Sequence, residues 1–472
     1  MSRAAIRVVL LATLATACAS PAPRPPRASP NVVLIFTDDQ GWADVGCQGA
    51  RGFSTPNLDR LASEGARLTN FYAAQPVCSA SRAAILTGCY PNRIGIAGAL
   101  APSSTHGLAQ SETTLAELLK ERGYATALFG KWHLGHLPQF LPTRHGFDEW
   151  FGVPYSHDMW PFHPDGPKPW TDLPRMRGDT VLELNPDPGT WTRAVSEEAL
   201  RFVREHADEP FFLYLPHPLP HVPLGTSPEF RGRTATAYGD VIEELDHETG
   251  RLLALLDELD LARDTIVIFA SDNGPWTPYG EHAGNVGPLR ESKGTVFEGG
   301  VRVPCIVRWP GHVPAGRVID EPAMTIDVLP TVAAWTGARA PELPIDGCDI
   351  SATLEARPHD TSPRPFFFWY ESNELQAVRY GRWKLHFPHS YRFTDEMERA
   401  TGGRPAKYPV RQLELSLFDL ETDLGERHDV SAEHPTVVAQ LSGLAQAMRV
   451  RLGDSLRGVR GTENRPAGRA SD

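Results

Sequence analysis

Short runs of β-branched and aromatic residues alternate along this chain with segments that have the spacing of amphipathic helices. The apolar runs lie at residues 32–37, 125–129, 211–215, 265–270 and 301–308. The helical patterns lie at residues 111–123, 194–206, 237–259 and 325–335. When strands and helices alternate, consecutive strands pack parallel and the helices cover both faces of the sheet. The sequence therefore predicts an α/β fold with a large, mostly parallel mixed sheet that helices flank.

The pattern changes after about residue 350, which indicates a second structural unit. Short apolar runs and one long helical pattern follow, at residues 366–370, 377–380, 383–387 and 435–452. Closely spaced short strands are typical of antiparallel pairing. We therefore expect a main domain at residues 31–350 and a smaller C-terminal α+β subdomain at residues 351–455. Residues 456–472 are polar and rich in glycine and arginine, so we expect them to be disordered.

The N-terminus resembles an export signal. Two arginines precede a short apolar stretch at residues 8–15, and small residues precede Cys18. This stretch is shorter than the roughly 20 apolar residues that span a bilayer. We expect a signal peptide at residues 1–17, followed by lipidation of Cys18 or by simple cleavage. Residues 18–30 form a proline-rich tether, and the chain would be exported to a bacterial periplasm or anchored in the outer membrane.

The charge balance limits the possible partners. Lysine and arginine number 46 against 58 aspartate and glutamate residues, which gives a net charge of −12. An acidic chain is a poor non-specific binder of nucleic acid, so we expect no nucleic-acid partner. An anionic substrate would need a local basic pocket.

The six cysteines leave the disulfide state open. Export permits disulfides. If Cys18 and Cys78 serve other purposes, the remaining four allow three pairings, and free thiols are an equal alternative. These four are Cys47, Cys89, Cys305 and Cys348.

Acidic side chains follow two of the predicted strands. Asp38 and Asp39 come directly after the run at 32–37, and Asp272 and Asn273 follow the run at 265–270. Ligands bind at the carboxyl ends of strands in open α/β sheets. Three carboxylates and an amide offer only oxygen atoms, which suits a hard cation such as Ca²⁺ or Mg²⁺. A helix cap and a turn are the structural alternatives.

Basic side chains follow two other strands. Lys131 and His133 come after the run at 125–129, and His217 and His221 come after the run at 211–215. Each group alone could belong to an ordinary turn. Their shared position at strand ends predicts that they lie beside the acidic residues.

One segment combines a nucleophile with a cation at the start of a helix. Cys78, Ser79, Ala80, Ser81 and Arg82 precede a short apolar helical stretch. Arg82 lies about one helical turn after Cys78, so both side chains can reach one site. The first turn of a helix attracts anions through its dipole.

This segment, Cys78-Ser79-Ala80-Ser81-Arg82 with Leu86-Thr87-Gly88, resembles the signature of the type I sulfatases in the alkaline-phosphatase superfamily. Other blocks of that family match as well, at Gly130–Gly135, Ser156–Asp158, His221–Pro223, Lys293–Thr295, Glu298–Arg302, Leu417–Leu420 and Gly425–Glu426. The resemblance covers most of residues 31–450. Ala80 departs from the family pattern, which most often has proline there, and leaves open which maturation enzyme acts.

The resemblance implies a reaction and a role for each site residue. Cys78 would be converted to formylglycine by a maturation enzyme, and one hydroxyl of its hydrate would attack the sulfur of a sulfate monoester. Asp38, Asp39, Asp272 and Asn273 would bind one calcium ion. Arg82 would fix the hydroxyl, Lys131 and Lys293 would bind sulfate, His221 would be the acid, His133 the base and Ser156 a further donor.

Two alternatives remain at the level of the sequence. The chain could be a formylglycine-dependent phosphodiesterase or phosphonate hydrolase, or a non-catalytic binder of sulfated glycans if Cys78 is unmodified. The substrate would be a sulfated small molecule or, preferably, a sulfated glycan. Trp160, His163 and Trp170 lie in a loop at 160–177 that either lines a sugar subsite or packs on its own aromatic residues. The roles of His157, Asp158 and His217 stay undecided.

Overall fold

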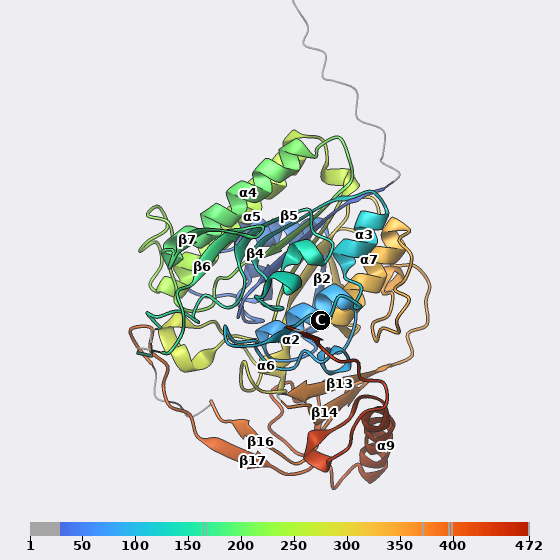
Figure 1. Ribbon diagram of the computed structural model, residues 1–472. Coiled ribbons are helices and arrows are strands. Elements are labelled where there is room, and N and C mark those ends of the chain that lie inside the picture. Colours follow the sequence, from blue (N-terminus) through green and yellow to red (C-terminus); the bar gives the residue numbers. More distant parts are fainter. Residues whose placement is uncertain are drawn as a thin grey trace, which may run out of the picture.

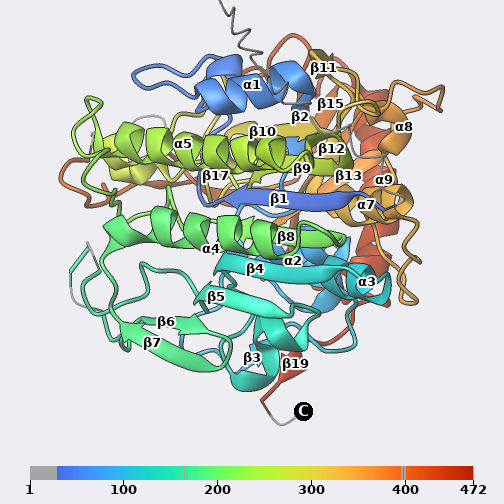
Figure 2. The same cartoon turned by 90° about the horizontal axis from the view of Figure 1, so that it is seen from above.

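A large mixed sheet runs through the middle of the molecule (Figures 1 and 2). Its strands are β1 (Asn31–Thr37), β2 (Ala66–Tyr72), β4 (Ala125–Lys131), β5 (Glu149–Val153), β6 (Pro174–Arg177), β7 (Thr180–Leu184), β8 (Phe211–Pro216), β9 (Thr265–Ser271), β10 (Arg302–Arg308), β11 (Arg317–Ile319) and β12 (Ala323–Met324). They lie in the order β11-β2-β10-β9-β1-β8-β4-β5-β6-β7, with β12 beside β2. The five strands from β9 to β5 are parallel, which confirms the predicted fold class.

The computed structural model describes residues 29–163, 165–166, 168–370, 372–394, 397 and 400–470. The expected signal peptide, Cys18 and nearly all of the tether lie outside these residues. In the part that is described, no helix is both long and apolar enough to cross a bilayer.

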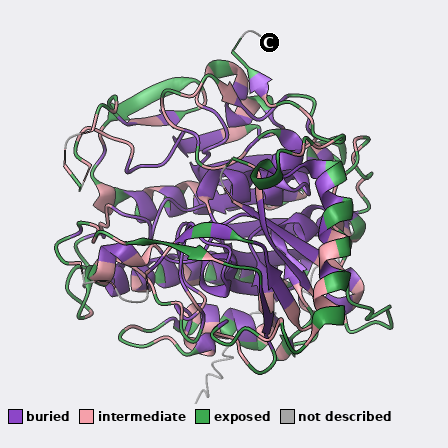
Figure 3. Cartoon of the chain, turned by 90° about the horizontal axis from the view of Figure 1, so that it is seen from below, coloured by how far each residue is buried: buried purple, intermediate pink, exposed green. Residues whose placement is uncertain are grey.

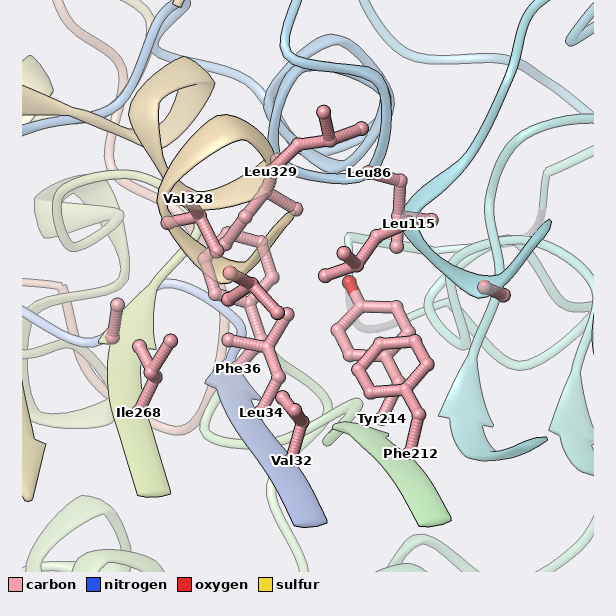
Figure 4. Close-up of a cluster of buried hydrophobic side chains, with 14 of the residues drawn as sticks. Val32, Leu34, Phe36, Leu86, Leu115, Phe212, Tyr214, Ile268, Val328 and Leu329 are labelled. Atoms are coloured by element: carbon pink, nitrogen blue, oxygen red, sulfur yellow. The ribbon is translucent and has the colours of Figure 1, made fainter. Parts of the chain in front are cut away.

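Helices cover both faces of the large sheet. Successive side chains of β1 point to opposite faces, so each face carries apolar residues that pack against helices. Val33 and Ile35 pack with α1 (Pro56–Glu64), α4 (Trp191–Glu205) and α5 (Ala237–Glu258). Leu34 and Phe36 face α2 (Cys78–Thr87), α3 (Leu115–Glu121) and α7 (Val328–Thr336) (Figure 4). Figure 3 shows the buried residues concentrated in this sheet and in the helix faces that touch it.

The C-terminal subdomain is an antiparallel sheet with one long helix, as the sequence predicted. Its elements are β13 (Pro365–Tyr370), β14 (Glu374–Tyr380), β15 (Trp383–His386), β18 (Ser416–Asp419), the hairpin of β16 (His389–Arg392) and β17 (Val410–Leu413), and α9 (Pro435–Leu452). Aromatic residues of β13 and apolar residues of α9 share one core with Tyr72 and Tyr90 of the main domain. The two units therefore pack through a common hydrophobic core.

A buried ionic cluster joins the two units beside this core. Lys384 of β15 lies 2.8 Å from Glu298 and 3.3 Å from Glu426, and all three side chains are fully buried. Glu426 also accepts a hydrogen bond from the Glu298 backbone and pairs with His386 at 2.7 Å. Because α6 (Glu298–Val301) begins at Glu298, the cluster fixes the chain that follows Lys293.

The end of the chain is ordered, so the prediction of a disordered tail is wrong for residues 456–470. The strand β19 (Gly468–Arg469) pairs with β3 (His106–Gly107), and Arg465 lies 2.6 Å from buried Glu112. The sequence shows the polar composition of this segment, but it does not show that its charged groups have partners far away in the chain. These ionic and backbone contacts hold the tail in place, although it has few apolar side chains to bury.

The cysteines of the described chain favour the free-thiol alternative. Cys47, Cys78, Cys89, Cys305 and Cys348 are all free. No two of them form a disulfide among the described residues.

Candidate active site

The register of the central strands brings the acidic residues together at the carboxyl edge of the sheet. Thr37 of β1 pairs with Ser271 of β9, so Asp38 and Asp272, which follow them, leave the sheet side by side. The Asp272 backbone donates a hydrogen bond to the Thr37 carbonyl at 3.0 Å, which continues the ladder by one step. The predicted metal ligands thus meet because two parallel strands end at the same level.

The four predicted ligands form one connected cluster. The Asp39 backbone donates to Asp272 Oδ1 at 3.1 Å, and Asn273 Nδ2 donates to Asp39 Oδ1 at 2.7 Å. Asp39 has a φ of 66°, a left-handed conformation that is uncommon outside glycine. This turn lets two consecutive carboxylates, Asp38 and Asp39, approach the same point.

The helix α2 begins at Cys78 and delivers it to the same edge of the sheet. All ten residues of α2 are buried, and Val77 before it is extended. The Ser79 hydroxyl accepts from the Leu100 backbone at 3.0 Å, and the Ala80 backbone donates to the Gly98 carbonyl. Cys78 Sγ lies 3.6 Å from Asp38 Oδ1 and 3.3 Å from the Lys293 ammonium. The nucleophile candidate is therefore held between a carboxylate and an ammonium group.

Arg82 lies one turn along α2 and binds the carboxylates. Its Nε and Nη2 donate to Asp272 Oδ2 at 3.1 and 2.8 Å, and Nη2 lies 3.4 Å from Asp38. The two bonds to one oxygen are charge-assisted and fully buried, which fixes the guanidinium firmly. Arg82 thus orients the acidic cluster. The sequence predicted a role for Arg82 at the Cys78 hydroxyl but did not predict these contacts with the carboxylates.

The two lysines approach the cluster from different elements. Lys131, at the end of β4, lies 2.5 Å from Asp38 and donates to the Ser156 hydroxyl at 3.0 Å. Lys293 lies 2.6 Å from Asp39. Burial is the largest single influence and lowers the lysine pKa, but Asp39 and the other nearby acidic groups together keep that pKa well above its usual value. Both lysines are therefore positioned beside Cys78 as cations for an anionic substrate.

The Cys78 thiol is a poor nucleophile in this environment. Burial, and then the charge of Asp38, raise the pKa of Cys78 to about 12. A cysteine acts as nucleophile or metal ligand through its thiolate, which is scarce at such a pKa near neutral pH. Unmodified Cys78 is therefore unsuited to catalysis or to metal binding.

The acidic cluster fits a hard divalent cation. Burial and the neighbouring charge of Asp38 raise the pKa of Asp272 to about 7, and burial raises that of Asp39 to about 6. Asp39 Oδ2 and Asn273 Oδ1 are buried and accept no hydrogen bond within the described chain. Ca²⁺ and Mg²⁺ bind clusters of oxygen atoms like these, which repel one another and include atoms without a hydrogen-bond donor. A zinc site with Cys78 and His221 would need the thiolate that burial disfavours.

Two histidines border Cys78 and are neutral at neutral pH. Burial and then Lys293 lower the pKa of His221 to about 4, and its Nε2 lies 3.5 Å from Asp39. Burial also lowers the pKa of His133 well below the usual value. His133 Nε2 contacts the Leu100 carbonyl at 2.8 Å, so Nδ1 carries the lone pair and has no partner among the described residues. Nδ1 is thus the ring nitrogen at which His133 would accept a proton.

The three undecided residues separate in the structure. Asp158 borders the pocket that contains Cys78, and the His157 ring lies 5.6 Å from that of His221. His217 instead borders a small cavity with Glu248 behind the sheet. His217 is therefore not part of the site.

Trp160 and His163 of the segment at 160–177 pack on neighbouring residues, and its end forms β6 of the large sheet. Trp160 contacts Phe162 edge to face at 5.2 Å between ring centroids, and His163 lies 3.7 Å from Asp158. Trp160, His163 and Trp170 are absent from the described residues that border the pocket. The structural alternative for this loop is thus favoured over a sugar subsite.

A pocket of about 230 Å³ opens above Cys78 and includes residues that sequence reasoning missed. Trp276 borders it with its ring 4.8 Å from the Lys293 ammonium. Tyr370 and Arg392 come from the C-terminal subdomain. Trp276 lies close to Asn273 in the sequence, which is a weak signal, whereas the other two have no motif that could have identified them.

The comparisons with known proteins agree along most of the chain. The family described as Sulfatase matches residues 30–338, and the C-terminal region of aryl-sulfatase matches residues 362–458. Arylsulfatase A of Bos taurus is 39% identical over 89% of this chain and 86% of its own length. N-acetylgalactosamine-6-sulfatase of Homo sapiens is 37% identical over 91% of this chain and 86% of its own length.

The solved structures give the same result. The crystal structure of Ps i-CgsB in complex with k-i-k-neocarrahexaose superposes with a TM-score of 0.74 at 29% identity, covering 89% of this chain and 92% of that one. Sequence, fold and relatives thus agree. The chain belongs to the sulfatase family and is a sulfuric ester hydrolase.

Proposed function

We propose that this enzyme hydrolyses a sulfate monoester, preferably a carbohydrate sulfate, to an alcohol and inorganic sulfate. The proposed nucleophile is formylglycine formed from Cys78, and the proposed metal is one calcium ion held by Asp38, Asp39, Asp272 and Asn273. The observation that carries the proposal is the position of Cys78, buried at the start of α2 between Asp38 and Lys293.

Conversion of Cys78 resolves the problem of its unreactive thiol. The hydrated aldehyde supplies two hydroxyls on one carbon, one for attack on sulfur and one for release of sulfate. Because Cys78 and all of α2 are buried, the maturation enzyme must reach this segment before the chain folds. Export of the chain, and lipidation of Cys18, belong to the same proposal.

The charged residues of the site have different roles: some bind the substrate, and others position the carboxylates. Calcium held by these residues would act as a Lewis acid, polarising sulfate oxygens and lowering the pKa of a nearby hydroxyl. Lys131 and Lys293 bind the remaining sulfate charge, and Arg82 holds Asp272 and Asp38 in place. Ser156, which Lys131 contacts, is a donor to substrate or water.

The two histidines move protons on either side of the reacting group. His133 Nδ1 accepts the proton from the second hydroxyl, since its Nε2 is engaged by Leu100. His221 protonates the leaving oxygen, which requires that its pKa rise once a sulfate lies beside it. An anionic substrate supplies that electrostatic effect.

Two observations support a sugar as the leaving group. Asp158 borders the pocket, and its Oδ1 is buried without a hydrogen bond in the described chain, so it can accept from a substrate hydroxyl. Its charge is retained, because His221 and other partners outweigh burial and lower its pKa. A relative is named for a sulfated amino sugar, and a solved structure holds a carrageenan oligosaccharide.

The test combines the state of Cys78 with turnover. Mass spectrometry of the peptide that contains residue 78 should show a mass about 18 Da below the cysteine form. The same preparation should release sulfate from an aryl sulfate and from sulfated sugars, and should act far less on a phosphodiester. An unmodified thiol together with full turnover would falsify the formylglycine mechanism. Absence of sulfate release from every ester would refute the function.

A further inference from the structure

The C-terminal subdomain contributes one wall of the active-site pocket. Tyr370 ends β13 and Arg392 ends β16, and both border the pocket together with Cys78 and Lys293. These two residues reach the site only because the subdomain packs against the main domain. The Tyr370 hydroxyl and the Arg392 guanidinium therefore border the part of the pocket that would hold the substrate beyond its sulfate group.

Gly294 makes this close approach possible. It has a φ of 81°, and a Cβ atom at this position would lie 3.0 Å from Tyr370 Oη and 3.1 Å from Arg392 Nη1. The phenol and the guanidinium thus rest against the backbone directly after Lys293. The Arg392 guanidinium also faces the Tyr408 ring at 5.4 Å, which supports its plane.

The position of Arg392 differs from that of the sulfate-binding cations. Cys78 Sγ contacts Asp38 and Lys293, and Lys131 contacts Asp38 and Ser156 at the inner end of the site. Arg392 borders the same pocket from the other domain, behind Gly294. In a chain with a net charge of −12, a pocket-lining arginine there creates a local attraction for a second anion.

We propose that Arg392, with Tyr370 beside it, binds a second acidic group on the leaving alcohol. A carboxylate or a second sulfate matches the planar, two-pronged geometry of a guanidinium. The favoured substrate class is therefore a sulfated sugar that carries a uronate or another sulfate near the ester. This inference rests on the proposed function and deepens it.

The test compares two substrates that differ in one charge. The singly charged probe is N-acetylgalactosamine 6-sulfate linked to glucose, and the doubly charged probe is the same sulfated sugar linked to glucuronate. Wild-type enzyme should have the higher kcat/KM for the doubly charged probe. Arg392→Ala should reduce that value by about tenfold or more, mainly through KM, because a charge-assisted hydrogen bond is lost. The singly charged probe and an aryl sulfate should change less than about threefold.

Two further variants sharpen the result. Arg392→Lys keeps the charge without the planar fork and should restore part of the preference. Arg411→Ala removes the same charge from β17, opposite Tyr391 and outside the pocket, and should leave both probes unaffected.

Other results would overturn either the proposed subsite or the proposed function. An equal loss on all probes in Arg392→Ala would show that Arg392 serves the sulfate or the fold and would overturn the subsite. An unchanged preference, or a wild-type preference for the singly charged probe, would overturn it too. Failure of the wild type to hydrolyse any sulfate ester would instead refute the proposed function.

Discussion

Residue 78 occupies a position that suppresses ordinary thiol chemistry and favours a neutral group. It is buried, and the carboxylate of Asp38 lies 3.6 Å from its sulfur. A thiolate would be repelled there, whereas a hydroxyl can donate a hydrogen bond to Asp38 or accept one from Lys293. This environment supports the proposal of an oxygen nucleophile at residue 78.

We predict that Cys78→Ser performs at most one turnover. Its single hydroxyl could attack sulfur once, but the resulting ester has no second hydroxyl that can expel sulfate. If the maturation system accepts only cysteine, intact mass after incubation with an aryl sulfate should show a sulfated serine. Cys78→Ala should be inactive and folded, since a small residue replaces a small one. Multiple turnovers from a serine shown by peptide mass to be unmodified would contradict the two-hydroxyl cycle.

His145 gives a prediction about acid stability away from the reacting groups. Its ring lies tilted against that of Trp132, with 5.6 Å between the centroids, and both of its ring nitrogens lack partners in the described chain. Burial lowers its pKa from 6.5 to about 4. Between these values the unfolded chain binds a proton that the folded chain does not, so the free energy of unfolding falls as the pH falls.

Replacing His145 by phenylalanine should therefore flatten this dependence. The slope of unfolding free energy against pH between about pH 4 and 6.5 should fall by about 1.4 kcal/mol per pH unit, equivalent to one proton. Urea unfolding at several pH values measures it. A variant with the wild-type slope would show that another group is responsible.

At the scale of elements, the C-terminal segment braces a loop of the active site. Arg465 pairs with Glu112 and its backbone donates to the Arg93 carbonyl, while β19 pairs with β3. The loop between Arg93 and β3 carries Gly98 and Ala99 of the pocket wall. It also carries the Leu100 carbonyl that orients His133. The segment after residue 458 lies beyond the family match and yet supports this loop.

Deletion of residues 460–472 should lower kcat by about tenfold to a hundredfold, because small displacements of catalytic groups are costly. The pH–rate profile should shift as well, since His133 loses its fixed acceptor. Arg465→Met should have a smaller effect in the same direction, and Arg460→Ala, at an exposed position of the same segment, should have none. A truncated enzyme with a cooperative melt and unchanged kcat and pH profile would refute the bracing role.

The elements that sequence predicted well are those whose environment is uniform. The central strands are buried on both faces and read as continuous apolar runs, so β1, β8 and β9 were predicted within one residue at each end. The strands β2, β6 and β7 were missed because they mix polar and apolar residues near the sheet edge, where neighbours decide the structure. Sheet order likewise depends on contacts that no local pattern reports.

The same distinction holds for the site. The acidic, basic and cysteine residues follow strand ends or begin a helix, so local patterns and the resemblance identified them. Tyr370 and Arg392 reach the pocket because the second domain packs against the first. Arg82 pairs with Asp272, a contact that depends on the conformation of its side chain. These contacts are properties of the folded chain and leave no motif.

At the scale of the whole molecule, we expect the fold to depend little on the proposed metal. Three buried hydrophobic clusters fill both faces of the large sheet and the domain junction. A chain of this length buries a large share of its surface without help from a metal. Metal loss should therefore affect the reaction far more than the folded state.

We predict that removal of calcium by a chelator lowers the rate by about a hundredfold or more, the several kcal/mol expected of a Lewis-acid metal, while the thermal transition stays cooperative. Added calcium should restore activity. The matched variant is Asp272→Asn, because alanine would leave the buried Arg82 without its main partner and destabilise the fold for a separate reason. This variant should bind calcium weakly, keep a cooperative melt and lose activity to a similar extent. Full turnover by Asp272→Asn at saturating substrate, or by the chelated enzyme with its metal content verified as negligible, would exclude these four residues as the ligands of a catalytic metal.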